Sequence, residues 1–424
     1  MSIDEYQHGL WAEDRLESVC LWTFGVDLVA RSPQLIEPSG PKEFSDILID
    51  LGPEIVVFQS KSVMIEASDL DDIKSGRVSR KIDDAKRQLR TALNALTRKS
   101  TVTYENGIGI RTEIDWDLVK NVTGIVTLNM PDELYNDPEY RTSIPLAVDS
   151  FGDYEVHVFI LRDFFLLARD YSTPQDLLSY LNDRKYAFNI KNIVVMNELD
   201  FVAFLKSYYD DFEKLKNGEG GTDMFYLSPG LWEHYCEDEV VNKAREVNIK
   251  DSMYFDRVLY ELKTTIGYAV EQQTCSEEEA IKQYFTIVRA LSNLKRVERR
   301  EFSRMMISKY NNTRNNPFSY FLNVFPVQDI SILFFASNDI DREAKQKILY
   351  AFCVNASKMV DTKNFLGIVT EGSKAPGFSL DIIFADTDYL REQEDGLSEM
   401  AWFKPIKKTE IVEWELDSSA DCVE

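Results

Sequence analysis

The segment 46–61, Asp-Ile-Leu-Ile-Asp-Leu-Gly-Pro-Glu-Ile-Val-Val-Phe-Gln-Ser-Lys, constrains the fold more than any other part of the chain. Its β-branched and apolar residues on either side of Gly52 and Pro53 predict two short strands joined by a turn. If the hairpin closes about that turn, Asp46 lies opposite Gln59, and antiparallel neighbours are only about 5 Å apart. Lys61 shares the face of Gln59, because side chains alternate along a strand. One carboxylate, one carboxamide and one ammonium thus lie together on an otherwise apolar sheet. This arrangement is costly for packing alone and indicates a functional site.

Composition predicts a soluble, multidomain protein. The chain has 424 residues, of which 44% are apolar and 28% charged, as in ordinary globular proteins. No apolar run approaches the roughly 20 residues of a membrane span, and the first residues lack a secretory pattern. The five cysteines are scattered and the histidines number three, which favours reduced thiols and argues against a histidine-rich zinc site. We therefore expect a cytoplasmic protein with no membrane association.

The charge distribution is uneven. The net charge of −24 argues at first against a nucleic-acid ligand. Residues 74–99, which follow the hairpin closely, nevertheless carry a local net charge of +7, and residues 289–314 carry +6. A basic run often does no more than neutralise an acidic body. We favour that internal role for the second run, whereas the position of the first run after the hairpin favours a contact with phosphate.

Periodicity predicts an α/β (α+β) chain. Helices are expected at 10–24, 79–96, 251–272, 276–300 and 342–359, and a further helix begins at Thr173 and Pro174. Besides the hairpin, strands are expected at 108–114, 122–128, 156–160, 190–196, 330–335, 365–369 and 380–384. The glycine cluster at 216–222 indicates a linker between domains at 1–215 and 223–424. The second domain is expected to be mainly helical, with a small βαββ section.

A helix carrying Glu17, a strand carrying Asp46, a strand carrying Gln59-Ser-Lys61 and a basic helix follow one another in the first hundred residues. This order resembles the PD-(D/E)XK nuclease superfamily, the restriction-endonuclease-like fold. Asp46 matches the lone aspartate of the motif, Gln59 and Lys61 match its (D/E)-x-K part, and Glu17 matches the extra carboxylate on the first helix of many members. The resemblance covers residues 10–98 and implies a mixed sheet flanked by helices.

The resemblance implies a Mg²⁺- or Mn²⁺-dependent endonuclease acting on DNA, in bacterial antiviral defence or DNA processing. Mg²⁺ is held by one or two carboxylates and several waters. The implied ligands are Asp46, Glu17 and the amide oxygen of Gln59, with Lys61 orienting water or neutralising the phosphate. The implied nucleic-acid contacts are Lys81, Lys86, Arg87, Gln88 and Arg90. The glutamine departs from the family's usual acid and weakens the attraction for metal, and Glu17 would partly compensate.

Other interpretations of the same residues remain open. Asp46 is also suited to bonding a loop amide, and Lys61 to protecting a sheet edge. Asp50 is a rival ligand in the same strand and on the same face as Asp46, although it lies next to the turn. The acidic residues Glu66, Asp69, Asp71 and Asp72 are expected to form a solvated connection. A catalytically degenerate nuclease fold that binds nucleic acid or protein is the main alternative. A third interpretation is an interaction protein that does not bind nucleic acid, which the large negative charge would fit. Its partner would be another protein or a second copy of the chain.

Overall fold

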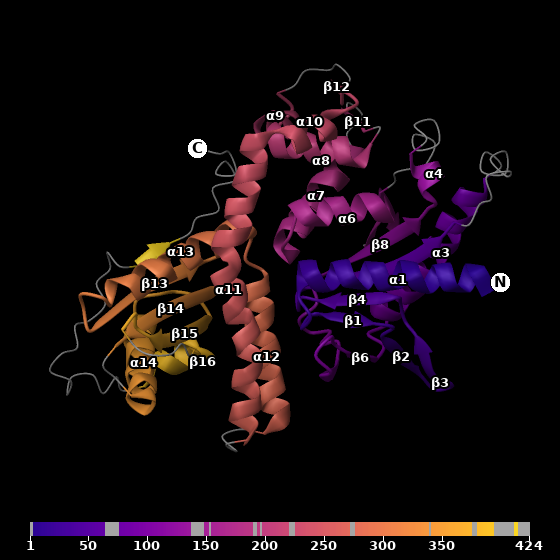
Figure 1. The fold of residues 1–424 in the computed structure, drawn as a ribbon. Helices are drawn as coiled ribbons and strands as arrows, with labels where there is room; N and C mark the ends of the chain where they lie inside the picture. Colours follow the sequence, from indigo (N-terminus) through magenta and orange to yellow (C-terminus); the bar gives the residue numbers. More distant parts are fainter. Residues whose placement is uncertain are drawn as a thin grey trace. The chain divides into compact units, whose positions relative to one another are not determined.

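The computed structural model divides the chain into two compact units, residues 1–243 and 244–424. Both units are mixed α/β, with sheets flanked by helices as the sequence predicts (Figure 1). No helix in the described residues is long and apolar enough to cross a membrane. The structure describes residues 3–63, 76–136, 148–151, 154–189, 193–195, 197–219, 225–271, 276–338, 341–374, 380–393 and 411–413.

The first unit is built on a six-stranded sheet with the order β1-β4-β5-β8-β10-β9. Strands β5, β8 and β10 run parallel in the middle, and β4 with β1 on one side and β9 on the other are antiparallel to their neighbours. Parallel neighbours need a crossover, which the helix α3 provides between β5 and β8. The strand bounds are β1 Val29–Arg31, β4 Ile47–Asp50, β5 Glu54–Ser62, β8 Asn121–Asn129, β9 Val148–Phe151 and β10 Tyr154–Ile160.

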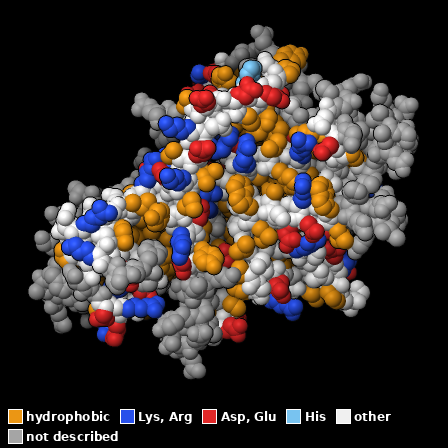
Figure 2. Space-filling view, viewed as in Figure 1, with side chains coloured by type: hydrophobic (Ala, Val, Ile, Leu, Met, Phe, Trp, Pro, Cys, Tyr) orange, Lys and Arg blue, Asp and Glu red, His pale blue; other side chains and the backbone are white. Residues whose placement is uncertain are grey.

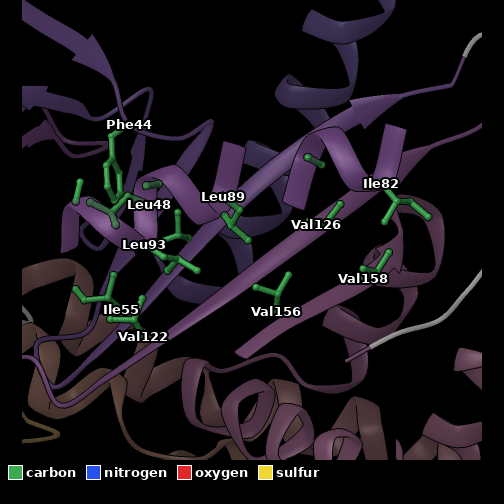
Figure 3. Packing of buried hydrophobic residues seen from close by; sticks show 14 of the residues in the cluster. Phe44, Leu48, Ile55, Ile82, Leu89, Leu93, Val122, Val126, Val156 and Val158 are labelled. Carbon is green, nitrogen blue, oxygen red and sulfur yellow. The ribbon is translucent and has the colours of Figure 1, made fainter. Parts of the chain in front are cut away.

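Helices cover both faces of this sheet, which explains the nearly continuous apolar runs of its strands. Helices α1 (Ile3–Phe24) and α6 (Leu161–Asp170) lie on one face, where Phe58 packs edge-on against Phe24 and Phe164. Helix α3 (Arg77–Thr97) lies on the other face and packs its apolar stripe against alternate residues of the strands (Figure 3). Asp46, Gln59 and Lys61 belong to the α3 face by the same alternation that directs Ile55 and Val57 there.

Smaller elements complete the first unit. A four-stranded sheet has the order β3-β2-β6-β7, and a two-stranded pair joins β11 to β12. Helix α7 begins at Pro174, and the Thr173 hydroxyl accepts a hydrogen bond from the Asp176 N–H, as predicted. The bounds are β2 Gln34–Glu37, β3 Gly40–Glu43, β6 Val102–Glu105, β7 Arg111–Glu113, α4 Asp132–Tyr135, α7 Pro174–Asn189, β11 Ile193–Val194, α8 Glu198–Ser207, α9 Tyr209–Lys216, β12 Phe225–Tyr226 and α10 Leu231–Glu237.

The second unit contains a five-stranded sheet with the order β16-β15-β14-β13-β17. Helix α13 packs Phe302 onto Phe321 of β13, whereas α14 packs Phe352 onto Tyr320. Because Tyr320 and Phe321 are consecutive in one strand, the two helices cover opposite faces. The bounds are α11 Glu239–Glu271, α12 Glu277–Ser292, α13 Arg296–Asn312, β13 Phe318–Phe325, β14 Ile330–Ser337, α14 Arg342–Ser357, β15 Asn364–Glu371, β16 Leu380–Asp386, α15 Thr387–Arg391 and β17 Ile411–Glu413.

Three sequence predictions need correction. The helix expected at 276–300 is broken at residues 293–295, where the Lys295 N–H donates to Glu298 and starts α13 as a new helix. The strand expected at 108–114 shrinks to β7, because the Asn106 side chain accepts hydrogen bonds from the N–H groups of Ile108 and Ile110 and holds a turn. The unit boundary lies at Lys243, beyond the glycine cluster, because α10 packs back onto α8.

Candidate functional site

The hairpin has the register that the sequence predicts. Ile47 pairs with Phe58 and Asp50 with Ile55, so Asp46 and Gln59 are opposite each other at the start of β4. Gly52 takes a positive φ of 83° in the turn, a conformation that glycine adopts at little cost. Since β4 begins opposite Phe58, the last residues of β5 extend beyond the end of β4. The polar end of the hairpin therefore lies where the sheet narrows.

Asp46 is fixed by two short hydrogen bonds. The Gln59 side-chain amide donates to Oδ1 at 2.7 Å, and the backbone N–H of Ser60 donates to Oδ2 at 2.6 Å. Asp46 and Gln59 are 8% and 7% exposed, so both contacts are shielded from water. Each carboxylate oxygen keeps a further lone pair for another ligand. The amide nitrogen of Gln59 thus orients the aspartate, and its amide oxygen is left for another ligand.

Burial raises the pKa of Asp46 to about 6. The Ser60 hydrogen bond and the Lys61 charge oppose this increase, and the negative charges of Glu13 and Glu43 add to it. A buried carboxylate with a raised pKa gains most from a nearby cation, because the cation favours the charged form. Lys61, half-buried on β5, also lowers the pKa of Glu13, which burial raises. The site therefore couples Asp46, Lys61 and Glu13 electrostatically.

Glu17, the carboxylate that the resemblance selects, belongs to an ion-pair cluster around Arg31. It accepts a hydrogen bond from Arg31 Nη1 at 2.9 Å, and the same nitrogen contacts Asp14 at 2.6 Å. Glu13, one helical turn earlier, lies 3.6 Å from Arg31 and is the α1 carboxylate that raises the pKa of Asp46. The sequence contains a signal for Glu13, because this residue lies four residues before Glu17 on the same stripe of the helix. Glu43, in the short strand β3, had no comparable signal.

A cavity of about 340 Å³ opens beside Asp46 and Gln59. Helix α3 contributes Gln88, one of the residues expected to contact nucleic acid, so the cavity brings three of the predicted residues together. Charge at its wall comes from Lys42 and Glu43. The remaining lining residues are Leu35, Phe44, Ser45, Thr91 and Ala92.

The basic helix α3 is only partly available to a ligand. Lys86 forms an ion pair with Asp149 of β9 and is 17% exposed, whereas Arg87 is 77% exposed and pairs with Asp84 at 2.8 Å. Arg90 stacks over the ring of Phe151 at 4.8 Å, and Lys81 is half-buried. On the face of the molecule drawn in Figure 2, basic side chains are interspersed with acidic and apolar ones. Arg87 and Arg90 are the predicted basic contacts that the structure leaves on the surface.

The second basic run has the internal role that we favoured. Arg296 and Arg299 of α13 both contact Asp256 of α11, at 2.7 and 3.1 Å. Arg304 contacts Asp251 at 2.9 Å. These ion pairs join α13 to α11 within the second unit.

The rival ligand Asp50 is committed to the fold. It accepts hydrogen bonds from the Gly52 N–H at 2.8 Å and from the Tyr104 hydroxyl at 2.7 Å, and therefore stabilises the turn and the contact with β6. The acidic residues expected to form a solvated connection, Glu66, Asp69, Asp71 and Asp72, lie outside the described residues.

The donors around Asp46 are suited to a hard divalent cation that keeps several waters. Within the described ranges, no group of three or more His, Cys, Asp or Glu side chains is arranged to hold a metal. The site offers instead one buried carboxylate with open lone pairs, the amide oxygen of Gln59 and the nearby charge of Glu13. Mg²⁺ is commonly held by one or two carboxylates and completes its octahedron with water and phosphate oxygens. This donor set fits Mg²⁺ better than zinc, which prefers a closed shell of nitrogen and sulfur ligands.

Comparison with known proteins finds no matching family model, no matching curated protein and no matching solved structure.

Proposed function

We propose that this protein is a metal-dependent endonuclease that hydrolyses phosphodiester bonds of DNA at the Asp46–Gln59–Lys61 site. The observation that carries the proposal is the buried Asp46 carboxylate, which Gln59 holds at 2.7 Å and whose pKa the charge of Lys61 lowers. The cavity beside them and the exposed arginines of α3 support it, since a phosphate backbone needs both an accessible reacting centre and cationic contacts.

Each side chain has a definable task in that reaction. Asp46 would hold the cation, with Gln59 and the Ser60 N–H fixing the carboxylate so that its remaining lone pairs face the ligand. When bound, Mg²⁺ lowers the pKa of a ligated water and stabilises charge that develops on the phosphoryl oxygens. The Lys61 ammonium would neutralise the added charge of the transition state and orient the attacking water. Glu13 would add negative charge near the cation, since its charge already acts on Asp46.

A second candidate function is a nucleic-acid-binding module without catalysis. The hydrogen bond from the Gln59 amide to Asp46 favours it, because this bond also gives Asp46 a purely structural partner. In that case Asp46 and Lys61 would shape the cavity, and binding would rest on Arg87 and Arg90 of α3.

The two functions are separated by their dependence on metal. The full chain is incubated with Mg²⁺ or Mn²⁺ and with linear, supercoiled, single-stranded and branched DNA, beside an RNA of the same sequence. Cleavage that requires metal and is lost in Asp46→Ala supports the nuclease. DNA binding that survives both EDTA and Asp46→Ala, without cleavage of any substrate, supports the binding module. Cleavage of RNA alone would overturn the assignment of DNA as substrate.

A further inference from the structure

We propose that the second unit binds a flat aromatic small molecule with an acidic substituent, in a cavity between α11, α13 and the sheet. The cavity has a volume of about 660 Å³, which lies within the usual range of small-molecule sites. Its lining residues, all from the second unit, are Met253, Tyr254, Arg257, Met306, Ile307, Tyr310, Asn311, Phe334 and Thr370. This site is separate from the hairpin and independent of the proposed nuclease activity.

The arrangement of the sheet accounts for the cavity. Helix α13 packs on β13 and β14 through Phe302 and Met306, whereas Thr370 belongs to the next strand, β15. Since Phe334 and Thr370 line the same space as Met306 and Ile307, they lie on the α13 face of the sheet. The floor of the cavity is therefore formed where β15 extends beyond the cover of α13.

Thr370, which lines this cavity, has a buried hydroxyl without a partner among the described residues. Thr370 is 1% exposed, and its Oγ1 makes no hydrogen bond to any part of the chain that the structure describes. Buried polar groups are almost always paired, because an unpaired one forfeits its hydrogen bonds to water. A ligand with a polar edge would satisfy Thr370, and this is the observation that indicates a binding site instead of a packing defect.

The lining determines the chemistry of the ligand. The rings of Tyr254, Tyr310 and Phe334 and the thioethers of two methionines favour an aromatic body, since both groups pack well against a π-face. Arg257 is 60% exposed, and its Nε and Nη2 both contact the same oxygen of Glu261, at 3.0 and 2.9 Å. Its Nη1 group makes no hydrogen bond or ion pair with the part of the chain that the structure describes, and is suited to an acidic substituent.

The test uses two dyes that differ in one group. The probe 8-anilinonaphthalene-1-sulfonate carries a sulfonate, and N-phenyl-1-naphthylamine has the same rings without it. We expect the full chain to bind the sulfonate dye saturably with one site per chain, and about tenfold more tightly than the neutral dye. Arg257→Met should remove that preference, while Arg304→Met, which alters an arginine of α13 outside the cavity lining, should retain it.

Filling the cavity provides the second arm. Ile307→Trp should weaken both dyes by about tenfold or more, because the indole occupies the space of the ligand. Val247→Trp, which adds the same ring at an exposed position of α11 outside the lining, should leave both affinities unchanged. Unchanged binding by a folded Ile307→Trp, equal affinity of the wild type for the two dyes, or no saturable binding would each overturn the proposal. If Ile307→Trp does not fold, the loss or retention of the preference for the sulfonate dye in Arg257→Met decides whether the proposal holds.

Discussion

At the scale of single residues, Asp46 has the environment that distinguishes the candidate site. It is buried, fixed at both oxygens and close to one lysine and two further carboxylates. Its contacts with Gln59, Ser60 and Lys61 follow from the hairpin register, which the sequence determines through the turn at Gly52. The sequence did not show which of the two carboxylates of α1 acts on Asp46, because that depends on how the helix packs against the sheet.

The raised pKa of Asp46 predicts a pH dependence of stability. Because its pKa is about 6 in the folded state and lower in the unfolded state, the folded state binds more protons between these values. The free energy of unfolding should therefore fall as the pH rises from about 4 to 7, by roughly 3 kcal/mol from this group. We expect denaturant titrations in EDTA to show a smaller fall for Asp46→Asn, and Mg²⁺ to reduce the fall in the wild type. Identical pH profiles for the two proteins would contradict this.

The two α1 carboxylates should differ in their effect on metal binding. Both contact Arg31, at 3.6 and 2.9 Å, and Glu13 is the one whose charge raises the pKa of Asp46. We expect Glu13→Gln to weaken Mn²⁺ binding, measured by calorimetry, by about 0.5–1 kcal/mol through the loss of a nearby charge. Glu17→Gln is the matched control and should change the affinity less. A larger loss in Glu17→Gln would restore the assignment that the resemblance suggested.

The unpaired hydroxyl of Thr370 predicts a stabilising substitution. Thr370→Val keeps the shape of the side chain and removes a buried polar atom that has no hydrogen-bond partner in the described part of the chain. In the absence of ligand the free energy of unfolding should increase by about 1 kcal/mol. Urea titration measures it, and a decrease in the midpoint would show that the hydroxyl is already satisfied.

At the scale of elements, the close contact between α3 and β8 positions the basic helix. A Cβ built on Gly124 would lie 2.4 Å from Leu89 Cδ2 and 3.0 Å from Val156 Cγ2, so α3 approaches β8 only because this residue is glycine. Periodicity predicted the apolar stripe of α3 but not this contact, because one sequence does not show which strand residue a helix meets. The break between α12 and α13 was missed for a similar reason, since it depends on the Lys295–Glu298 hydrogen bond.

Gly124→Ala should accordingly destabilise the first unit by about 1–3 kcal/mol through overpacking. Gly9→Ala is the control and should not destabilise it, because a Cβ added at this helical position would meet no described atom within 4 Å beyond the backbone of its own helix. Combining Gly124→Ala with Leu89→Ala should cost less than the sum of the two single changes, because the second removes the clash. Additive losses in urea titrations would contradict the contact.

At the scale of the whole molecule, the chain combines two α/β units, and each contains one of the two proposed sites. The first contains the hairpin site and the second contains the aromatic cavity. The sequence predicted two domains but placed the boundary at the most evident linker. The structure places it at Lys243, because packing of α10 on α8 outweighs the glycine-rich composition before it. The charge of −24 is compatible with DNA binding only if the basic contacts are local, as Arg87 and Arg90 are.

The most direct test of the central claim is the initial rate of Mg²⁺-dependent cleavage of supercoiled DNA by Lys61→Ala and Lys120→Ala. The two lysines lie at opposite ends of the hairpin region: Lys61 near Asp46, and Lys120 next to the turn, where its N–H donates to Pro53. We predict that Lys61→Ala lowers the rate by a factor of about 100 or more, as expected for a group that stabilises the transition state, while Lys120→Ala retains the wild-type rate. Equal rates for both variants, or no cleavage by the wild type, would contradict the account.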